Sequence, residues 1–547
     1  MADFYGTMQK VQDNVSITEN GMTGYKTTYH PLLDMNFKIS SYRHLTNQDI
    51  CNDIDKILAE QGDAKYLLKF LFMVRDVREG LGERRLFRVA LQHLISKANF
   101  TNKDEIINDL IKNQIVEFGR YDDLYAIFMG TKYQDTMIET ILNQLKQDYA
   151  NMEKNKPISL LAKWMPSENT SSAETRKMAK IFIKAFGTSA KDYRQALSKL
   201  RAYLKVTETY TSANEWGKID YNQVPSKANL KYKDAFLKHD EERRRDYLAA
   251  LRVGVDKDGK EVKINSTVNY PHEIVSKYGT YYNLTPYDEA LEQLWKNLKQ
   301  KDGLNNTIVV RDGSGSMTTA IGSGKTTALD VSTALAIYCS ERLNGTFKDK
   351  FITFSSQAKL VDLGNFDSLH AKLERCRKEG DCSNTNIENV FNLILNTAVE
   401  GNIKPEDMPE QVLIISDMEF DPASTRGSNY FTYGGMHADT NVFKKAAKNY
   451  NEAGYKLPKL VFWNVCSRTN TIPMKQNENG VVLVSGFSVN TLNMVLNGET
   501  DPMLALVKEI DSKQYEAIPY LENITLTNIT STTNNNKRVI KKPDFLK

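Results

Sequence analysis

An apolar run leads directly into a glycine-rich loop at Ile308-Val309-Val310-Arg311-Asp312-Gly313-Ser314-Gly315-Ser316. The β-branched run predicts a strand, and one aspartate and two serines stand at alternate positions just past it. The glycines let the backbone turn tightly, so that these oxygen-bearing side chains can gather on one small loop. Hard divalent cations such as Mg2+ prefer oxygen ligands and keep part of their water shell. The stretch therefore predicts a cation-binding loop at the end of a strand.

Short β-branched runs alternate with helical segments after residue 300. The predicted strands lie at 306–310, 349–354, 411–415, 459–465 and 481–484, with a hairpin partner of the second strand at 358–361. The predicted helices lie at 326–342, 386–398 and 442–453, and two more begin at Val489 and Met503. This alternation predicts a doubly wound α/β domain with a parallel sheet. Ligands of such sheets bind beyond the carboxyl ends of the strands, near the topological switch point.

The chain before residue 300 reads as one helix after another. Apolar residues recur at helical spacing in segments 63–77, 85–95, 104–118 and 137–152, and the loops between them are short and polar. No repeat of fixed period is apparent. So many amphipathic helices predict a stack of irregular helical pairs, similar to a solenoid. The expected fold class is therefore an all-α region followed by an α/β domain.

Two later elements add oxygen ligands to the Asp312 loop. Val412-Leu413-Ile414-Ile415-Ser416 predicts a strand that ends at Asp417, whose carboxylate can face the same crevice. Between these strands lies Gly380-Asp381-Cys382-Ser383-Asn384-Thr385-Asn386, a polar loop that can deliver the hydroxyl of Thr385. The alternative is a set of aspartates and serines that only cap helices. The sequence favours a metal site formed by Asp312, Ser314, Ser316, Thr385 and Asp417.

This order of residues resembles the metal-ion-dependent adhesion site (MIDAS) of von Willebrand factor A domains, which have a Rossmann-like sheet. The resemblance implies that Ser314, Ser316 and Thr385 touch the ion directly, whereas Asp312 and Asp417 act largely through water. Neutral hydroxyls leave much of the cation's charge uncompensated, so the open coordination position favours a carboxylate from a protein partner. Mg2+ or another divalent cation is the expected cofactor, and no catalytic residue is expected.

Two other motifs near this loop have an enzymatic interpretation with little support. Gly322-Ser323-Gly324-Lys325-Thr326-Thr327 ends like a phosphate-binding loop, but Thr319 stands where the first glycine is needed and no strand feeds the segment directly. Asp417-Met418-Glu419-Phe420-Asp421 crowds several carboxylates without a histidine cluster or a nucleophile–base pair beside them. We therefore expect a flexible loop at the first motif and no hydrolytic metal pair at the second.

Several stretches of the helical half, together with a C-terminal A domain, resemble the Ro autoantigen architecture. They include Arg75-Asp76-Val77-Arg78-Glu79-Gly80-Leu81-Gly82, Gly119-Arg120-Tyr121-Asp122-Asp123-Leu124, Leu161-Ala162-Lys163-Trp164-Met165-Pro166, Glu215-Trp216-Gly217-Lys218 and Tyr270-Pro271-His272-Glu273. The layout is a TROVE module of helical repeats followed by a von Willebrand factor A domain. The similarity is closer still to a related family of uncharacterised proteins from plants, fungi and viruses. It spans roughly residues 30 to 500.

The resemblance implies a ring or solenoid of HEAT-like repeats whose ends the A domain clasps. Ro proteins bind small structured RNAs on the outside of the ring and single-stranded RNA ends through its hole. The expected domains are an N-terminal extension (1–30), a TROVE-like helical domain (31–300), an A-like domain (301–515) and a C-terminal tail (516–547). The protein is expected to be a monomeric ring or a part of a larger assembly.

A local excess of positive charge supports RNA binding independently of the resemblance. Residues 163–205 contain ten lysines and arginines against three acidic residues, with aromatic residues interleaved. Phosphate attraction and base stacking are what single-strand binding needs. The alternative is a solvated helix face with aromatic core anchors. The candidate RNA contacts are Lys163, Arg176, Lys177, Lys180, Lys184, Lys191, Arg194, Lys199 and Arg201.

Mixed charges elsewhere in the helical half have a structural interpretation. Asp76, Arg78 and Glu83 stand close together in the chain, as do Arg120 and Asp122. We expect these residues to form ion pairs that hold neighbouring helices together, not RNA contacts.

The bulk composition limits the compartment and the partners. The chain has 547 residues, a net charge of +4 and a mean hydropathy of −0.49. No apolar run approaches the roughly 18–20 residues of a membrane span, and the N-terminus lacks the pattern of a secretory signal. Five scattered cysteines without a C-x-x-C suit reduced thiols. We therefore expect a cytoplasmic protein, or a virion component if it is viral, without a membrane partner.

The leading hypothesis from the sequence is a non-enzymatic RNA-binding protein that resembles Ro and also carries a metal site for a protein partner. The alternative is a metal-dependent interaction or assembly component, for example of a virus or phage particle, that binds no RNA. An NTPase or a nuclease is a third, poorly supported possibility.

Overall fold

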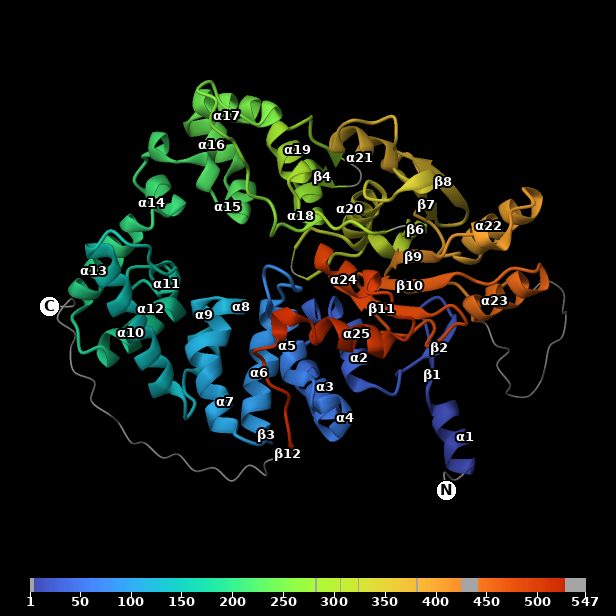
Figure 1. Ribbon diagram of the computed structural model, residues 1–547, viewed down its shortest axis with the longest axis horizontal. Helices are drawn as coiled ribbons and strands as arrows, with labels where there is room; N and C mark the ends of the chain where they lie inside the picture. Colours follow the sequence, from blue (N-terminus) through green and yellow to red (C-terminus); the bar gives the residue numbers. More distant parts are fainter. Residues whose placement is uncertain are drawn as a thin grey trace. The chain divides into compact units, whose positions relative to one another are not determined.

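The structure is a computed structural model that describes residues 4–280, 283–304, 306–322, 324–379, 382–424 and 441–526 (Figure 1). The chain divides into two compact units. Unit 1 consists of Met1–Tyr66 and Ser266–Gln514, and unit 2 consists of Leu67–Asn265 and Tyr515–Lys547. Both units are therefore discontinuous in the sequence. The boundary expected near residue 300 falls inside unit 1, which also takes in the expected N-terminal extension.

Unit 1 is built on a six-stranded sheet with the order β11-β10-β9-β6-β7-β8. The strands are β6 Thr307–Asp312, β7 Lys350–Phe354, β8 Ala358–Asp362, β9 Gln411–Ser416, β10 Lys459–Asn464 and β11 Val481–Ser485. All neighbouring strands are parallel except β7 and β8, which form the expected antiparallel hairpin. β6, the first strand of this sheet in the chain, lies in its middle. β7 and β8 are added on one side of β6, and β9, β10 and β11 follow on the other side, so the strand order reverses between β6 and β9. This mixed, mostly parallel sheet confirms the α/β prediction.

Helices lie against the sheet: α20 (Ala328–Ser340) contacts β6, β7 and β9, and α23 (Val442–Glu452) precedes β10 in the chain. Every residue of α20 is buried, because its sequence is apolar or small on nearly all sides. Thr327 caps this helix in a capping box with Asp330. α22 (Glu388–Glu400) contacts α23, β7 and β8. The remaining elements from the C-terminal part of unit 1 are α18 Pro271–Val275, β4 Gly279–Thr280, β5 Asn283–Leu284, α19 Glu289–Lys296, α21 Leu369–Arg377, α24 Leu492–Leu496 and α25 Pro502–Ile510.

The N-terminal segment belongs to the same unit as the sheet. Its elements are α1 Phe4–Asp13, β1 Val15–Ile17, β2 Thr23–Tyr25, α2 Pro31–Phe37, α3 Asn47–Ala59 and α4 Gln61–Ala64. β1 and β2 form an antiparallel hairpin, and Tyr25 and Ile472 exchange two backbone hydrogen bonds of 2.9 Å. α2 contacts β11, and the Asn36 side chain donates to the Leu483 carbonyl. The β1–β2 hairpin and α2 are therefore part of the α/β core, whereas α1 has no buried residue.

Unit 2 is helical, as expected. Its elements are α5 Leu67–Arg75, α6 Arg84–Lys97, β3 Ala98–Asn99, α7 Lys103–Asp109, a π-helical turn Leu110–Gln114, α8 Ile115–Phe118, α9 Tyr121–Phe128, α10 Gln134–Glu153, α11 Leu161–Trp164, α12 Ala173–Ala185, α13 Ala190–Tyr203, α14 Thr207–Ser212, α15 Ser226–Lys231, α16 Lys233–His239, α17 Glu241–Val253 and β12 Thr525–Leu526. Consecutive helices such as α5 and α6 or α12 and α13 pack in pairs. This pairing agrees with a helical-repeat region.

The chain returns to unit 2 after the sheet is complete. Tyr515 is fully buried against Phe118, and its hydroxyl donates to Asp76. β12 then pairs antiparallel with β3. The expected C-terminal tail is therefore ordered on the helices up to Leu526, and the rest of that prediction, 527–547, lies outside the described residues.

A buried ion-pair network joins helices α5, α6 and α9. Asp123, with no exposed surface, accepts hydrogen bonds from Arg75 Nε at 2.8 Å and Arg88 Nε at 2.6 Å. Asp122 accepts from Arg88 Nη2 at 2.7 Å. The expected ion pairs between helices are present for Asp122 and for Arg78, which pairs with Glu117, whereas Arg120 lies over the Trp164 ring.

Candidate metal centre

Asp312 and Asp417 lie at the carboxyl ends of two neighbouring strands. Asp312 is the last residue of β6, and Asp417 follows β9 directly. β6 and β9 pair in parallel, and the strand order reverses between them. This is the topological switch point, where open α/β sheets bind their ligands. The sheet therefore places both carboxylates where the sequence predicts the site.

The Asp312 carboxylate organises its own loop. Asp312 Oδ1 accepts the Ser314 amide at 2.9 Å, and Oδ2 accepts the Ser416 hydroxyl at 2.6 Å. The loop also runs close to the 382–385 segment, since the Gly315 amide donates to the Ser383 carbonyl at 3.0 Å. A Cβ at Gly315 would lie 2.7 Å from the Cys382 carbonyl oxygen, so only glycine fits here.

The expected hydroxyl ligands lie around these carboxylates. Ser314 Oγ and Ser316 Oγ are 3.0 Å apart, and the Ser316 hydroxyl lies near enough to Asp417 to oppose the rise in the pKa of that carboxyl. Thr385 is buried, and its carbonyl accepts the Asp421 amide at 3.1 Å, which ties its loop to the segment after β9. Two residues of the expected Thr385 loop, Gly380 and Asp381, lie outside the described residues. All five predicted metal residues are described, and contacts link them directly or through neighbours.

Both carboxyl groups are almost completely buried, and the charge of Asp312 acts on Asp417. Burial raises the pKa of Asp312, while hydrogen bonds from Ser416 and Ser314 act in the opposite direction. Burial, and then the negative charge of Asp312, raise the pKa of Asp417 well above its usual range. Asp417 Oδ2 accepts no hydrogen bond from any described residue. Two buried acids at the ends of neighbouring strands are an unfavourable arrangement unless a positive charge compensates them.

These residues fit a hard divalent cation. Hydroxyl and carboxylate oxygens are the donors that Mg2+, Ca2+ and Mn2+ prefer, and the orphaned Asp417 oxygen is available to such an ion or to its water shell. Within the described part of the chain, no cluster of three or more histidine, cysteine, aspartate or glutamate side chains has the arrangement of a metal site. A thiolate or imidazole site of the zinc type is therefore not supported in these residues.

Four residues around the centre were not singled out as parts of it by the sequence. Glu419 is buried and accepts the backbone amides of Glu19, Arg468 and Thr469. Arg468 Nη2 lies 3.6 Å from Asp417 Oδ2 and also pairs with the Glu19 carboxylate. Asn20 Nδ2 donates to Thr385 Oγ1 at 3.1 Å. Glu419 appeared in the sequence only as one member of a crowded acidic motif, and here it anchors loops.

The lysine-rich segment of unit 2 divides into two groups. Arg201 donates to the Ala162 and Met165 carbonyls, Arg176 donates to the Thr170 and Ser171 carbonyls, Arg194 pairs with Glu168, and Lys163 lies 3.7 Å from Glu208. The other five candidates are exposed and form no hydrogen bond or ion pair with any described residue; they are Lys177, Lys180, Lys184, Lys191 and Lys199. The structure therefore leaves these five, on α12 and α13, as the accessible RNA candidates.

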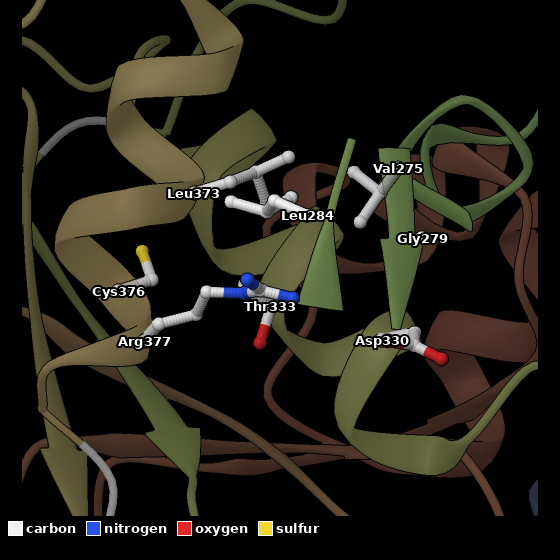
Figure 2. Close-up of a pocket in the computed structure, with 8 residues that line it drawn as sticks. All are labelled: Val275, Gly279, Leu284, Asp330, Thr333, Leu373, Cys376 and Arg377. Carbon is white, nitrogen blue, oxygen red and sulfur yellow. The ribbon is translucent and has the colours of Figure 1, made fainter. Parts of the chain in front are cut away.

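Two hollows elsewhere in unit 1 do not extend the centre. Figure 2 shows a cavity in which the Arg377 side chain reaches toward Thr333, with Cys376 beside it. Its volume of about 20 Å³ suits no more than a water molecule. A wider apolar groove of about 750 Å³ includes Ile308, Phe347 and Met408, near the amino ends of the strands. Neither hollow is lined by the predicted metal residues.

The motif that ends like a phosphate-binding loop forms a turn before α20. Ala320 and Thr327 form an antiparallel bridge, and the Ile321 amide donates to the Thr326 carbonyl at 2.8 Å. Ser323 of this motif lies outside the described residues. The segment does not follow a strand directly, in contrast to a nucleotide-binding loop.

Comparison with known proteins gives domain matches without an assigned activity. Two family models match, both described as domains of unknown function: DUF2828 at residues 169–309 and DUF7788 at residues 306–537. "Uncharacterized protein L728" of Acanthamoeba polyphaga mimivirus is 27% identical over 572 residues, which cover 98% of this chain and 94% of the viral protein. The RO (RSR) protein of Deinococcus radiodurans is similar in structure with a TM-score of 0.41 and 14% identity, over 82% of this chain and 93% of that chain. A similarity of this size does not establish a shared function.

No helix in the described residues combines the length and apolarity that a membrane crossing requires. All five cysteines are free thiols, and burial raises the pKa of Cys339 to about 12 and that of Cys376 to about 11. These two thiols are therefore poor nucleophiles at neutral pH.

Proposed function

We propose that unit 1 is a divalent-metal-dependent binding module that holds an acidic side chain of a protein partner. The observation that carries this proposal is the buried Asp417 Oδ2, which accepts no hydrogen bond from the described residues and lies beside a second buried carboxylate. Arg468, 3.6 Å from this oxygen, also pairs with Glu19, so its one charge does not balance both buried carboxylates, and a bound cation supplies further positive charge. Because the ligand set is rich in neutral hydroxyls, the bound ion keeps enough charge to attract an anion.

Each residue has a distinct part in this proposal. Ser314, Ser316 and Thr385 offer hydroxyl oxygens to the ion, while Asp312 and Asp417 compensate its charge, largely through water. Ser416 orients Asp312 through the 2.6 Å hydrogen bond. When bound, Mg2+ supplies a Lewis-acidic position for a carboxylate, and no step of this function requires a chemical reaction. We therefore propose a binding protein and not an enzyme.

A pull-down of the full chain tests the metal-dependent partner. The wild type is compared with and without EDTA, and with Asp312→Ala. Asp367→Ala removes an exposed carboxylate of the same unit and serves as the matched control. We expect a partner that is lost with EDTA and with Asp312→Ala but retained with Asp367→Ala. A partner retained equally in all four samples would contradict the proposal.

A second function, RNA binding by unit 2, is supported by one specific observation. Lys177, Lys180 and Lys184 lie at helical spacing on α12 and are exposed without ion pairs to described residues. Neighbouring α13 adds Lys191 and Lys199. Unneutralised lysines on adjacent helices attract phosphate, and this attraction weakens as salt rises. The sequence ranks RNA binding first, and the structure gives more support to the metal centre.

Charge reversal tests the RNA proposal. We expect Lys177→Glu/Lys180→Glu/Lys184→Glu to weaken binding of a single-stranded RNA and to reduce the salt slope of log K by about 2, if all three lysines contact phosphate. Lys112→Glu/Lys146→Glu/Lys154→Glu gives the same change of net charge at other exposed positions of unit 2. Equal loss in both triple variants, or no RNA binding at low salt, would show that α12 is not an RNA surface.

The ring of helical repeats stays a prediction from the family resemblance. The paired helices of unit 2 are what a repeat module requires, and the association of the chain into a larger assembly likewise stays a prediction. Small-angle scattering of the purified chain would distinguish a closed particle from an open solenoid.

A further inference from the structure

The tip of the N-terminal hairpin reaches the candidate metal centre. Residues 18–20 connect β1 to the turn before β2, more than 360 residues before Thr385 in the chain. Asn20 Nδ2 donates to Thr385 Oγ1 at 3.1 Å and to the Glu419 carbonyl at 2.6 Å. The Glu19 carboxylate pairs with Arg468, whose Nη2 lies 3.6 Å from the orphaned Asp417 Oδ2. Two adjacent hairpin residues thus contact the surroundings of two predicted metal residues.

The hairpin is firmly seated beneath this tip. Thr18 is buried and donates to the Phe420 carbonyl at 2.8 Å, and Thr18 Oγ1 accepts the Met22 amide at 2.9 Å. Met22 has no exposed surface. The Glu19 amide also donates to Glu419 Oε2 at 2.8 Å. The backbone of the tip is therefore fixed at the centre by contacts that do not involve the Glu19 carboxylate.

The side chains of the tip remain accessible in spite of this seating. The Glu19 side chain is 55% exposed, and Asn20 is exposed as well. An exposed ion pair costs little to break, since such pairs stabilise by at most about 1 kcal/mol. The Glu19 carboxylate can therefore leave Arg468 without unfolding of the hairpin.

We propose that Glu19 and Asn20 form a built-in cap of the metal centre, in which Glu19 is the resident acid that an acidic side chain of the partner replaces. This inference rests on the proposed metal function. Asn20 holds the Thr385 hydroxyl in a hydrogen bond, and Glu19 holds Arg468 next to Asp417. A partner's carboxylate binds the ion and takes over the Arg468 guanidinium from Glu19, so cap and partner exclude each other.

The cap lowers the apparent affinity of the protein for its partner. When the competent, uncapped state is only a fraction of the population, the apparent affinity falls by that fraction. A pair worth at most about 1 kcal/mol keeps the cap closed in roughly four molecules of five, which weakens binding about fivefold. The cap also weakens the binding of small carboxylates from solution, because they must displace the Glu19 carboxylate, which is held at high local concentration. The partner is therefore a protein segment that offers a carboxylate in a fixed position.

The test uses the full chain loaded with Mn2+ and [13C]acetate as the carboxylate probe. Bound Mn2+ is measured by electron paramagnetic resonance, and acetate binding by its paramagnetic relaxation. We expect Glu19→Gln to tighten acetate binding about fivefold, with the Mn2+ affinity unchanged within about twofold. Glu374→Gln removes an exposed carboxylate on α21 of the same unit and is the matched control.

Each outcome bears on one proposal only. Acetate binding that is equal in Glu19→Gln, Glu374→Gln and the wild type would overturn the cap while leaving the metal centre intact. Loss of Mn2+ affinity in Glu19→Gln would also overturn it, because Glu19 would then hold the ion itself. Absence of Mn2+ binding in the wild type would instead contradict the proposed function.

Discussion

Asp123 in unit 2 and Asp417 in unit 1 are both buried carboxylates, yet their surroundings differ. Arg75, Arg88 and the Arg120 amide all donate to Asp123. One oxygen of Asp417 accepts no hydrogen bond from the described residues, and the Asp312 charge opposes its ionisation. A fully satisfied buried acid stabilises a fold, whereas a buried acid with one unsatisfied oxygen beside a second buried acid indicates a ligand that is bound in function.

Substitution of Asp123 tests its structural part. Asp123→Asn leaves Arg75 and Arg88 without their shared carboxylate, and Arg75 is buried. We expect the free energy of unfolding to fall by about 3–5 kcal/mol, measured by urea denaturation. Glu117→Gln breaks an exposed pair with Arg78 and should cost under about 1 kcal/mol. Similar costs for both variants would show that the buried network does not stabilise the helices.

Substitution of Asp417 is expected to leave the free energy of unfolding of the metal-free protein unchanged or to raise it. Asp417→Asn removes a buried charge that repels Asp312, so the metal-free variant should be at least as stable as the metal-free wild type. The wild type should gain about 2.7 kcal/mol at a Mg2+ concentration one hundred times Kd, and the variant should gain nothing. Thermal unfolding with Mg2+ and with EDTA measures both quantities. A destabilised variant that still responds to Mg2+ would show that Asp417 serves the fold and not the ion.

At the scale of elements, the β1–β2 hairpin depends on a close approach at Gly24. A Cβ there would lie 2.5 Å from Thr471 Cγ2 and 2.6 Å from the Ile472 carbonyl oxygen. We expect Gly24→Ala to lower the free energy of local opening of the hairpin by about 1–3 kcal/mol. Tryptic cleavage at Lys26 should then be about tenfold faster or more.

Gly62→Ala is the matched control for this hairpin. Gly62 lies in α4, and a Cβ there meets no atom within 4 Å. This substitution should be neutral or slightly stabilising. Equal cleavage of both variants at Lys26 would show that the approach at Gly24 does not hold the hairpin in place.

The sequence predicted the central elements well for a physical reason. Strands buried on both faces are continuous apolar runs, and β6, β9, β10 and β11 have this pattern. The predicted hairpin of β7 and β8 is also confirmed. α21 was not predicted, because its sequence Leu369–Arg377 is rich in charge and only three of its residues are buried.

The candidate site was predictable only where its residues follow strands or open loops of recognisable type. Asp312, Ser314, Ser316 and Asp417 stand at strand ends, which the apolar runs locate. Asn20, Glu19 and Arg468 were missed, since their contacts span hundreds of residues and no local pattern marks them. A hydrogen bond between side chains so far apart in the chain depends on the folded hairpin alone.

At the scale of the whole molecule, the chain leaves and re-enters both units. The periodicity of apolar residues changes near residue 300, and a change of this kind predicts a domain boundary. The return of Tyr515 and β12 to the helices carries no such change, because a short apolar segment looks the same on either unit. Contacts, not periodicity, thus define the units.

The returning segment provides a test of this organisation. Tyr515→Ala removes a fully buried ring that contacts Phe118, and we expect a loss of about 3–5 kcal/mol. Hydrogen exchange should show the loss of protection in α5 to α9, with β6 and β9 as internal reference. Leu526→Ala changes a side chain that is 57% exposed and should have little effect. Full protection of α5 to α9 in Tyr515→Ala would show that this segment does not stabilise unit 2.

Direct titration of the purified chain with Mn2+, followed by electron paramagnetic resonance and competition with Mg2+, tests the metal centre most directly. We predict one tightly bound ion per chain in the wild type and in Asp367→Ala. Asp312→Ala should lose that ion, with its circular dichroism spectrum unchanged. A wild type that binds no ion, or an Asp312→Ala variant that binds it equally well, would show that these residues do not form a metal centre.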